Sequence, residues 1–339
     1  MNSLLYSATE AQHWLENALQ NRRAIVFCDS NTIEHCLPKL HVLEGLPIFV
    51  MEAGEEAKTI ATVENLLAFM LDHRISRNDV LINLGGGVVC DLGGFTASIY
   101  KRGIECINIP TTLLAMVDAA IGGKTAVNIG SLRNMCGTFA LPKAVLIFPS
   151  MLETLPQSEL LSGMAEMLKH AILQDHVAFE AFIQSSVSER CTAESILQSA
   201  EFKQQFVAND LHDRGRRQLL NAGHTAAHAI ESAFLKRKNA VPHGFAVAAG
   251  LWIEADLAMQ TGNANAIFIS ELKNYIESNF PKLQFDSEFI GDILVFMEAD
   301  KKNNACMVFC LPFSPGNVQR IEIAEITRIE NALIAYSNA

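Results

Sequence analysis

Residues 80–94 read VLINLGGGVVCDLGG, and this stretch decides the class of fold. A run typical of a buried strand leads directly into three glycines, and an apolar segment able to form a helix follows. Glycine lets the backbone approach a ligand closely, and exposed N–H groups at the start of a helix attract phosphate. The spacing matches neither GxGxxG nor GxxxxGK[ST]. The stretch therefore indicates a strand–turn–helix unit, in which the glycines fit a tight turn as well as a cofactor loop.

The neighbouring segments repeat this alternation of strand and helix. A helix is predicted over 59–72 from apolar residues at helical spacing. Alternation of this kind is typical of a largely parallel sheet with helices on its faces. The buried strands are predicted at 24–29, 47–52, 80–84, 104–109 and 144–148.

The pattern changes near residue 150. From about 155 to 279 the chain is rich in Ala, Leu, Glu, Gln and Lys, which favours helices. A strand pair is predicted near 307–311 and 318–323, joined by a turn over 312–316. We predict an α/β Rossmann-like N-terminal domain followed by a mainly α-helical C-terminal domain, with bounds 1–150 and 151–339.

Composition excludes several classes of function. The 339 residues are half hydrophobic and 19% charged, as in folded globular proteins. The net charge of −11 argues against nucleic acid and anionic membranes as partners. The eight cysteines include no CxxC pair, and neither a signal peptide nor a membrane-spanning run is recognised. A cytoplasmic protein with reduced cysteines is predicted.

Polar residues follow two of the predicted strands. Asp29 and Asn31 come after the first, where a ribose contact and a helix cap are equally compatible with the aspartate. Thr111 and Thr112 follow another strand, at the edge where open α/β sheets bind ligands. Together these positions predict a dinucleotide site.

Histidines at helical spacing point to a metal. His224 and His228 lie one turn apart in NAGHTAAH, and Glu166 and His243 are further candidates. Three His or carboxylate ligands with an open position are typical of catalytic zinc. Each histidine alone also fits a hydrogen-bonded helix residue. Cations near these segments fit solvated surface charges or, better, an anion site: Lys124, Arg133, Lys169, Lys203, Arg217, Lys301 and Lys302.

Taken together, these segments resemble the 3-dehydroquinate synthase family of sugar-phosphate cyclases. The resemblance extends from about Asp29 to 302. It implies a phosphorus–oxygen lyase of the shikimate pathway, a homodimer that uses NAD and zinc, or cobalt in its place. The motifs that carry it are GGGVVCDLGGF at 85–95, KRG at 101–103, PTTLLAMVDAAIGGKTAVN at 110–128, TLP at 154–156, GMAEMLKH at 163–170, GRRQLLNAGHTAAHAIE at 215–231 and HGFAVAAG at 243–250.

The resemblance also assigns roles to residues. Glu166, His224 and His243 would hold the metal, and His228 would orient a ligand or handle protons. Residues implied to contact NAD are Asp29, Asn31, Glu55, Lys58, Gly86, Gly87, Val88, Asp91, Thr111, Thr112, Lys124, Arg133 and Thr154. Residues implied to contact substrate are Arg102, Asp118, Lys124, Asn134, Lys169, Lys203, Arg217, Asn221, Lys301 and Lys302.

The implied reaction converts 3-deoxy-D-arabino-heptulosonate 7-phosphate to 3-dehydroquinate and phosphate. It comprises transient oxidation of the C5 carbinol, phosphate elimination, reduction and intramolecular aldol closure. Sibling cyclases, a metal-dependent polyol dehydrogenase and an inactive binding protein remain alternatives. Four departures from the family pattern are Arg133 for lysine, Phe245 and Leu211 for glutamates, and Ala140–Leu141 for an aromatic–Gln pair.

Overall fold

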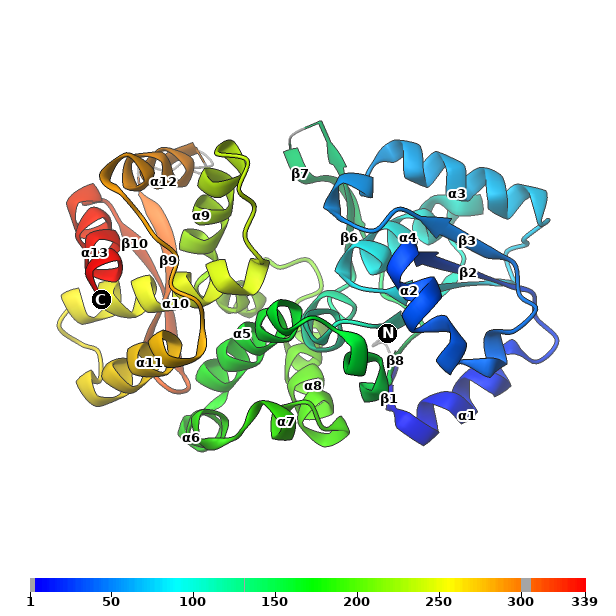
Figure 1. Cartoon of the computed structure of the whole chain (residues 1–339), viewed down its shortest axis with the longest axis horizontal. Coiled ribbons are helices and arrows are strands. Elements are labelled where there is room, and N and C mark those ends of the chain that lie inside the picture. The colour runs from blue at the N-terminus through cyan, green and yellow to red at the C-terminus, as the bar shows by residue number, and fades with distance from the viewer. Residues whose placement is uncertain (1–3, 131, 300–305) are drawn as a thin grey trace. The chain divides into compact units, whose positions relative to one another are not determined.

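A computed structural model describes residues 4–130, 132–299 and 306–339. The chain divides into two compact units, which Figure 1 displays in one view. The first comprises Met1–Pro156 and Val187–His212, and the second Gln157–Ser186 and Asp213–Ala339. The segment Val187–His212 thus groups with the N-terminal unit. The domain bounds expected from sequence remain a prediction.

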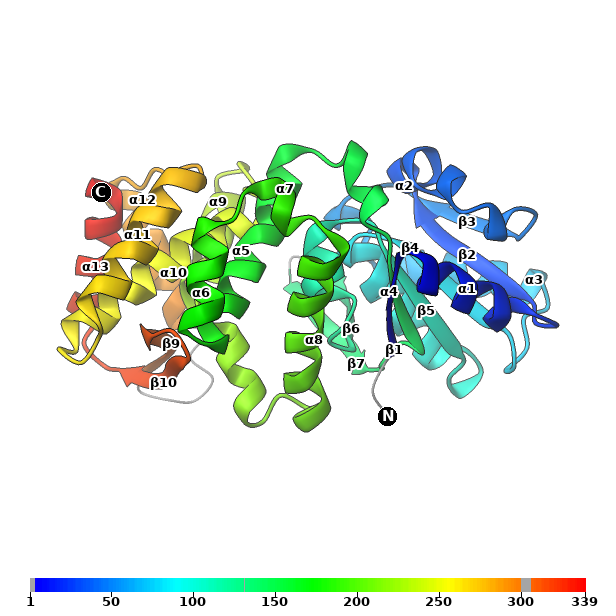
Figure 2. The ribbon, with the colours of Figure 1, turned by 90° about the horizontal axis from the view of Figure 1, so that it is seen from below.

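The first unit is built on a six-stranded parallel sheet with the order β1-β8-β5-β4-β2-β3. Helices α1 and α3 lie on opposite faces of this sheet (Figures 1 and 2). Its elements are β1 (Leu4–Ser7), α1 (Ala8–Leu19), β2 (Ala24–Asp29), α2 (Ser30–His35), β3 (Ile48–Met51), α3 (Ile60–Asp72), β4 (Val80–Gly85), α4 (Gly87–Ile99), β5 (Glu105–Pro110), β6 (Lys124–Ile129), β7 (Leu132–Phe139), β8 (Ala144–Ile147), α7 (Val187–Arg190) and α8 (Ala193–Asn209).

The core of this unit lies between the sheet and helices α3 and α4. Phe27, Leu81, Leu66 and Val89 are almost fully buried there. Each such side chain contributes about 1.5–3 kcal/mol by leaving water. All five predicted strands are present, which confirms the prediction of a Rossmann-like α/β fold for the N-terminal part.

Three features of the strands differ from the sequence expectation. Strand β1 and the antiparallel hairpin β6–β7 were not expected, since neither has a long apolar run. In the second unit, strand β9 (Met307–Ser314) extends through Pro312, which pairs with Val318 of β10 (Asn317–Ile323). The predicted turn over 312–316 is therefore shorter than expected.

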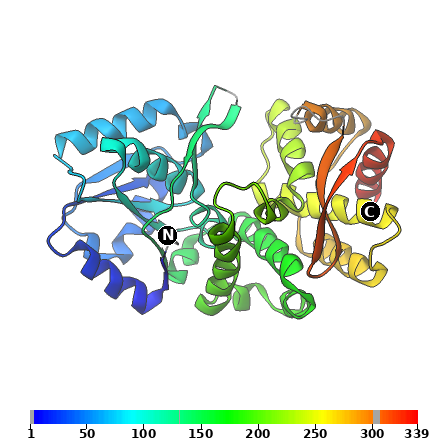
Figure 3. The ribbon, with the colours of Figure 1, turned by 180° about the vertical axis from the view of Figure 1, so that it is seen from behind.

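The second unit is mainly helical and is organised around α10 (His243–Gln260). This helix is buried from Ala246 to Ala255 and packs against α5, α9, α11, α13 and β9. A helix that is apolar on all sides needs neighbours on all sides. Figure 3 shows the β9–β10 pair lying against it. The remaining elements are α5 (Gln157–Gln174), α6 (His176–Gln184), α9 (His224–Lys236), α11 (Ala266–Asn279), α12 (Ser287–Ala299) and α13 (Ile326–Asn338).

The mainly helical second unit confirms the predicted character of this region. No helix in the described part of the chain is both long and apolar enough to span a bilayer.

Candidate active site

The carboxyl edge of the sheet contains a topological switch point between β2 and β4. From β2 the chain continues to β3 on one side and then crosses to β4 on the other. Ligands of open α/β sheets bind at such a point, because the following loops diverge there. Asp29 ends β2 and the glycine run ends β4, so the two segments highlighted by the sequence flank the switch point.

The glycine run forms a backbone-lined turn at the start of α4. Gly86 is the N-cap and supplies no side-chain hydrogen bond, so the first N–H groups of α4 are not capped by its own side chain. A Cβ on Gly85 would come within 2.4 Å of Val89 Cγ2, and one on Gly86 within 3.1 Å of Thr112 Cγ2. The N–H of Thr111 donates to Gly85 O at 3.0 Å. This turn has the chemistry of a phosphate cradle.

Asp29 caps a helix in this structure. Its Oδ1 accepts from the backbone N–H of Asn31 at 3.0 Å and of Thr32 at 2.9 Å, at the start of α2. Its other carboxylate oxygen is not involved in these two bonds. The helix-cap interpretation is therefore correct, while a ribose contact by Asp29 remains a prediction.

Lys58 is the buried charge of this edge. It is 4% exposed, and its Nζ lies 2.6 Å from both Asp91 Oδ2 and Asn134 Oδ1. Burial raises the pKa of Asp91 to about 6, although the attraction and hydrogen bond of Lys58 lower it. Nearby, Glu55 accepts from Asn128 at 2.8 Å. The structure thus brings four residues implied by the resemblance into neighbouring contacts.

Lys203 and Asp118 form a second ion pair of the first unit. The Nζ of Lys203 on α8 lies 2.6 Å from Asp118 Oδ1 and 2.7 Å from Asp118 O. Asp118 is held on the π-helix η5 (Ala115–Ala119). The other implied residues of this unit with exposed side chains are Asn31, Arg102, Lys124, Arg133 and Thr154.

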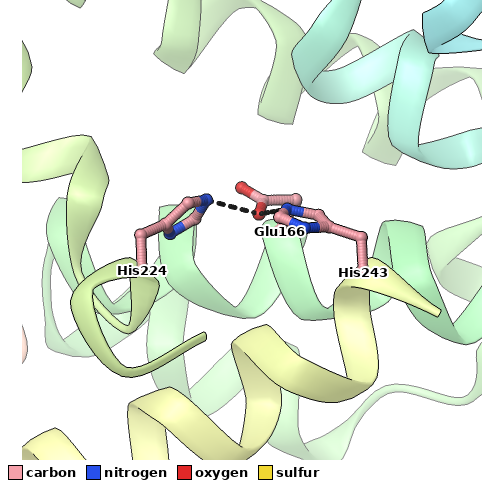
Figure 4. Close-up of side chains that lie close together, drawn as sticks. All are labelled: Glu166, His224 and His243. Carbon is pink, nitrogen blue, oxygen red and sulfur yellow. Dashed lines mark ion pairs between the residues drawn. The ribbon is translucent and has the colours of Figure 1, made fainter. Parts of the chain in front are cut away.

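Three predicted metal ligands converge in the second unit. Glu166 lies in the middle of α5, and His224 and His243 are the first residues of α9 and α10. Their side chains point toward one another (Figure 4). Glu166 Oε1 lies 3.4 Å from His224 Nε2 and 3.6 Å from His243 Nε2. One ligand atom from each residue falls within 4.8 Å of the others, a separation compatible with one ion between them.

The carboxylate of Glu166 is buried without ordinary hydrogen bonds. It is 0% exposed, and neither oxygen has a hydrogen-bond partner among the described residues, although Lys169 forms an ion pair with it. Burial raises the pKa of Glu166, but Lys169, His224 and His243 outweigh it and hold the pKa well below its usual range. Burial and Lys169 hold the pKa of His224 well below its usual range. An ionised carboxylate and a neutral imidazole are the forms that bind a metal.

The imidazoles of His224 and His243 are each oriented by a further contact at Nδ1. His224 Nδ1 lies 3.1 Å from Ala222 O, and His243 Nδ1 lies 3.4 Å from Glu231 Oε2. Burial lowers the pKa of His243, but the Glu166 and Glu231 carboxylates outweigh it and raise this pKa to about 10. In each ring Nε2 therefore faces Glu166 while Nδ1 is held by a neighbour, as in metal sites whose ligands are fixed from behind.

Comparison with known proteins shows the family of this chain. The family model for the 3-dehydroquinate synthase N-terminal region matches residues 48–162, and that for the C-terminal region matches 163–303. The 3-dehydroquinate synthase of Parabacteroides distasonis is 35% identical over 92% of this chain and 90% of its own. That of Pyrococcus abyssi is 38% identical over 96% and 97%.

The chain belongs to the 3-dehydroquinate synthase family.

Solved structures show how widely the fold of this 3-dehydroquinate synthase family member is shared. A 2-epi-5-epi-valiolone synthase from Streptomyces hygroscopicus, solved with NAD+ and Zn2+ bound, superposes with a TM-score of 0.82 at 24% identity, over 100% of this chain and 97% of its own. A 2-deoxy-scyllo-inosose synthase complexed with carbaglucose-6-phosphate, NAD+ and Co2+ gives 0.82 at 20% identity, over 99% and 96%. These similarities confirm the fold.

Further family-implied residues belong to the second unit. Lys169 is 1% exposed, and Arg217 on η7 (Arg216–Asn221) is 3% exposed. The His228 ring centroid lies 5.4 Å from that of His224, yet its side chain is exposed, as is Asn221. His228 does not belong to the cluster of three potential ligands. Lys301 and Lys302 lie outside the described residues.

Sequence reasoning missed two acidic residues beside this site. Glu231 contacts His243, and Glu254 is a buried residue of α10 that accepts from Gly223 at the start of α9. The signal for Glu231 was its spacing: it is seven residues after His224 and therefore on the same helix face. Glu254 had no comparable signal, because a single Glu in an apolar helix does not reveal what it faces. Of the four departures, Arg133 is exposed and Phe245 is partly buried on α10.

Proposed function

We propose that this chain is a 3-dehydroquinate synthase that converts 3-deoxy-D-arabino-heptulosonate 7-phosphate to 3-dehydroquinate and phosphate. The observation that carries the proposal is the convergence of Glu166, His224 and His243 in a member of this family. The product-forming sequence would be oxidation, elimination of phosphate, reduction and aldol closure, with no net consumption of NAD. Overall the enzyme would act as a phosphorus–oxygen lyase.

The residues of the second unit fit a zinc ion. Glu166 supplies a buried anion whose oxygens have no ordinary hydrogen bonds, and the two histidines present Nε2 to it. One carboxylate and two imidazoles are a ligand set of catalytic zinc. Bound zinc would supply Lewis-acid polarisation of substrate oxygens. Glu166, His224 and His243 would hold it, while Ala222 O and Glu231 keep the imidazoles oriented.

The residues of the first unit fit NAD. Gly85 and Gly86 bring the backbone close to any ligand at the start of α4, and Thr111 and Thr112 lie beside them. Bound NAD would supply a hydride acceptor that returns the hydride within one turnover. Gly86, Gly87 and Val88 would bind the pyrophosphate, and Asp29, Lys58 and Asp91 would line the same edge.

Buried cations would bind the anionic groups of the substrate. Lys169, Arg217 and Lys203 are each at most 6% exposed, and Lys169 and Lys203 form ion pairs with Glu166 and Asp118. They would orient the carboxylate and phosphate so that each step begins in a reactive geometry. His228 and Asn221 have exposed polar groups suited to holding a water or a phosphate oxygen for proton transfer.

The test is phosphate release from 3-deoxy-D-arabino-heptulosonate 7-phosphate by purified protein, with NADH absorbance recorded in parallel. We expect release that requires both zinc and NAD and leaves no lasting NADH signal. Metal-loaded protein that releases no phosphate would contradict the proposal and direct the assay to sedoheptulose 7-phosphate and glucose 6-phosphate. Net NADH formation would instead identify a polyol dehydrogenase.

The proposal extends to a cytoplasmic homodimer. All eight cysteines are free thiols, which suits a reducing compartment. Strand β7 exposes three large apolar side chains, Leu132, Met135 and Phe139, at 45–65%, and the proposed second subunit would cover some of them. Light scattering of the purified chain should give twice the 37.2 kDa monomer mass. A monomer at micromolar concentration would contradict the dimer and leave the activity proposal standing.

A further inference from the structure

The start of helix α9 has no cap of its own. Its N-cap is Gly223, which has no side chain and adopts φ 78°, a left-handed backbone conformation. The first residue of the helix is His224, a predicted metal ligand. The first N–H groups of a helix have no intrahelical acceptor and need one from elsewhere. Ser, Thr, Asp and Asn are preferred at the N-cap because their side-chain oxygens supply such an acceptor.

An acceptor reaches this helix start from α10. Glu254 is 0% exposed, and its Oε2 accepts from the Gly223 N–H at 2.7 Å. Burial raises the pKa of Glu254 to about 8, while hydrogen bonds from the backbone N–H groups of Gly223, Ala226 and Thr225 lower it. The side chain therefore faces the N–H groups of the first turn of α9, where a local cap would otherwise lie.

The contact between the two helices is unusually close. A Cβ on Gly250 would come within 2.0 Å of Gly223 O, the acceptor of the first α9 hydrogen bond. A Cβ on Gly223 would approach Leu251 Cγ at 2.8 Å. His243, Gly250 and Glu254 follow one face of α10, because they are separated by seven and eleven residues. This face of α10 thus carries the predicted ligand His243. It also contacts the start of α9, the helix that carries the predicted ligand His224.

Core packing alone does not explain Glu254. Its Oε1 has no hydrogen-bond partner among the described residues, and its neighbours along α10 are Ile253 and Ala255, both 0% exposed. A buried carboxyl group is costly unless hydrogen bonds compensate it, and an apolar side chain of the same size would suit such a core better. The compensating partner here is the N–H group of Gly223, which directly precedes His224.

We infer that Glu254 is a positioning residue that caps α9 from α10 and thereby holds His224 in the geometry that binds metal. This inference rests on the proposed metal site. Gly223 lies between Ala222, whose carbonyl contacts His224 Nδ1, and His224 itself. Because Glu254 holds the Gly223 N–H, it also fixes the position of the Ala222 carbonyl and of the His224 backbone. Loosening this turn would let His224 Nε2 move relative to Glu166.

The experiment compares three substitutions of Glu254 in the full-length protein by zinc affinity, measured with a competing chelator. Glu254→Met removes the acceptor at similar volume, and we expect zinc affinity to fall about tenfold, as for loss of other groups that orient metal ligands. Glu254→Gln keeps an acceptor oxygen and should stay within about threefold of the parent. Glu254→Asp is a milder substitution, one methylene shorter, and should bind zinc less tightly than Glu254→Gln.

Two further readouts separate positioning from general stability. Amide exchange at Gly223, Thr225 and Ala226 in metal-free protein should accelerate in Glu254→Met and not in Glu254→Gln. The visible spectrum of the Co2+ form should change in Glu254→Met. Trp252→Phe is the matched control, since it removes the 2.7 Å hydrogen bond to Glu277 from the same helix without altering Glu254. It should leave zinc affinity and the α9 amides unchanged.

The outcomes distinguish this inference from the metal assignment. His224→Ala that retains parental zinc affinity would overturn the metal assignment and the role of Glu254 with it. His224→Ala that loses zinc while Glu254→Met and Glu254→Asp bind it like Glu254→Gln would overturn the role of Glu254 alone. Equal loss in Trp252→Phe and Glu254→Met would show a general stability effect and also overturn it.

Discussion

Each of the two units has its own candidate site, and the two sites differ in how their buried charges are compensated. At the sheet edge, Lys58 lies 2.6 Å from both Asp91 and Asn134, so its charge has direct partners. In the helical unit, Glu166 forms an ion pair with Lys169, and its two imidazoles lie 3.4 and 3.6 Å away, distances too long for good hydrogen bonds. The sheet edge is complete as a folded surface, whereas the helical site has the donor atoms of an ion-binding site. The activity of the helical site should therefore depend on metal, whereas the stability of the sheet edge should not.

The largest effect should come from Glu166→Gln, which removes the anionic ligand and leaves Lys169 without its buried ion pair. We expect loss of stoichiometric zinc and a fall in kcat/KM of about a thousandfold, since Lewis-acid stabilisation is worth several kcal/mol. Metal analysis measures the zinc content, and phosphate release measures kcat/KM. His228→Ala is the control: it changes an exposed histidine on the same helix as His224 and should retain zinc. A Glu166→Gln enzyme with full zinc content would remove this contrast between the two units.

Lys58→Met should affect the sheet edge through stability. Breaking a buried ion pair leaves its partner charge uncompensated, and we expect the free energy of unfolding to fall by about 3 kcal/mol. Denaturant unfolding in the absence of metal measures it. The double variant Lys58→Met/Asp91→Asn should recover part of the loss, because the remaining group is neutral. A change below about 1 kcal/mol would mean that Lys58 is solvated like a surface lysine.

The pKa of Asp91 predicts the pH dependence of this edge. Burial raises the folded-state pKa to about 6 from its usual 3.8, so the folded state binds more protons between these values. The free energy of unfolding should therefore fall as pH rises from about 4 to 6, by about 2 kcal/mol, and stay level above. Asp91→Asn should lack this decline. Unfolding curves at several pH values check this prediction. It would be contradicted if the free energy of unfolding changed equally with pH in the parent and in Asp91→Asn.

Glu231→Gln should give the smallest effect of the series. It weakens the support of His243 Nδ1 but removes no ligand, and zinc affinity should fall about tenfold. Chelator competition measures the affinity. Lys273→Met is the control, because it removes an ion pair with Asp256 on α10 away from His243. Unchanged affinity in Glu231→Gln would show that His243 is oriented by the start of α10 alone.

The candidate sites of the two units also differ in how far the sequence predicted them. The sheet edge follows from local patterns: strands that end in Asp29, Gly85 and Pro110 place their termini at one edge of any parallel sheet. Exceptions are β1 and the hairpin β6–β7, which depend on pairing partners far along the chain. Lys58, Asp91 and Asn134 were implied only by family resemblance, because no spacing rule joins a loop, a helix and a hairpin.

In the helical unit, the sequence by itself determined the residue types of the site and the family to which the chain belongs. Periodicity placed His224 and His228 on one helix face, and family resemblance implied Glu166, His224 and His243 as the ligands. The packing of α5, α9 and α10 is what brings these three side chains together. The role inferred for Glu254 likewise depends on a contact between helix segments 31 residues apart. Local sequence sets helix faces and strand ends, whereas the meeting of side chains from different elements depends on tertiary packing.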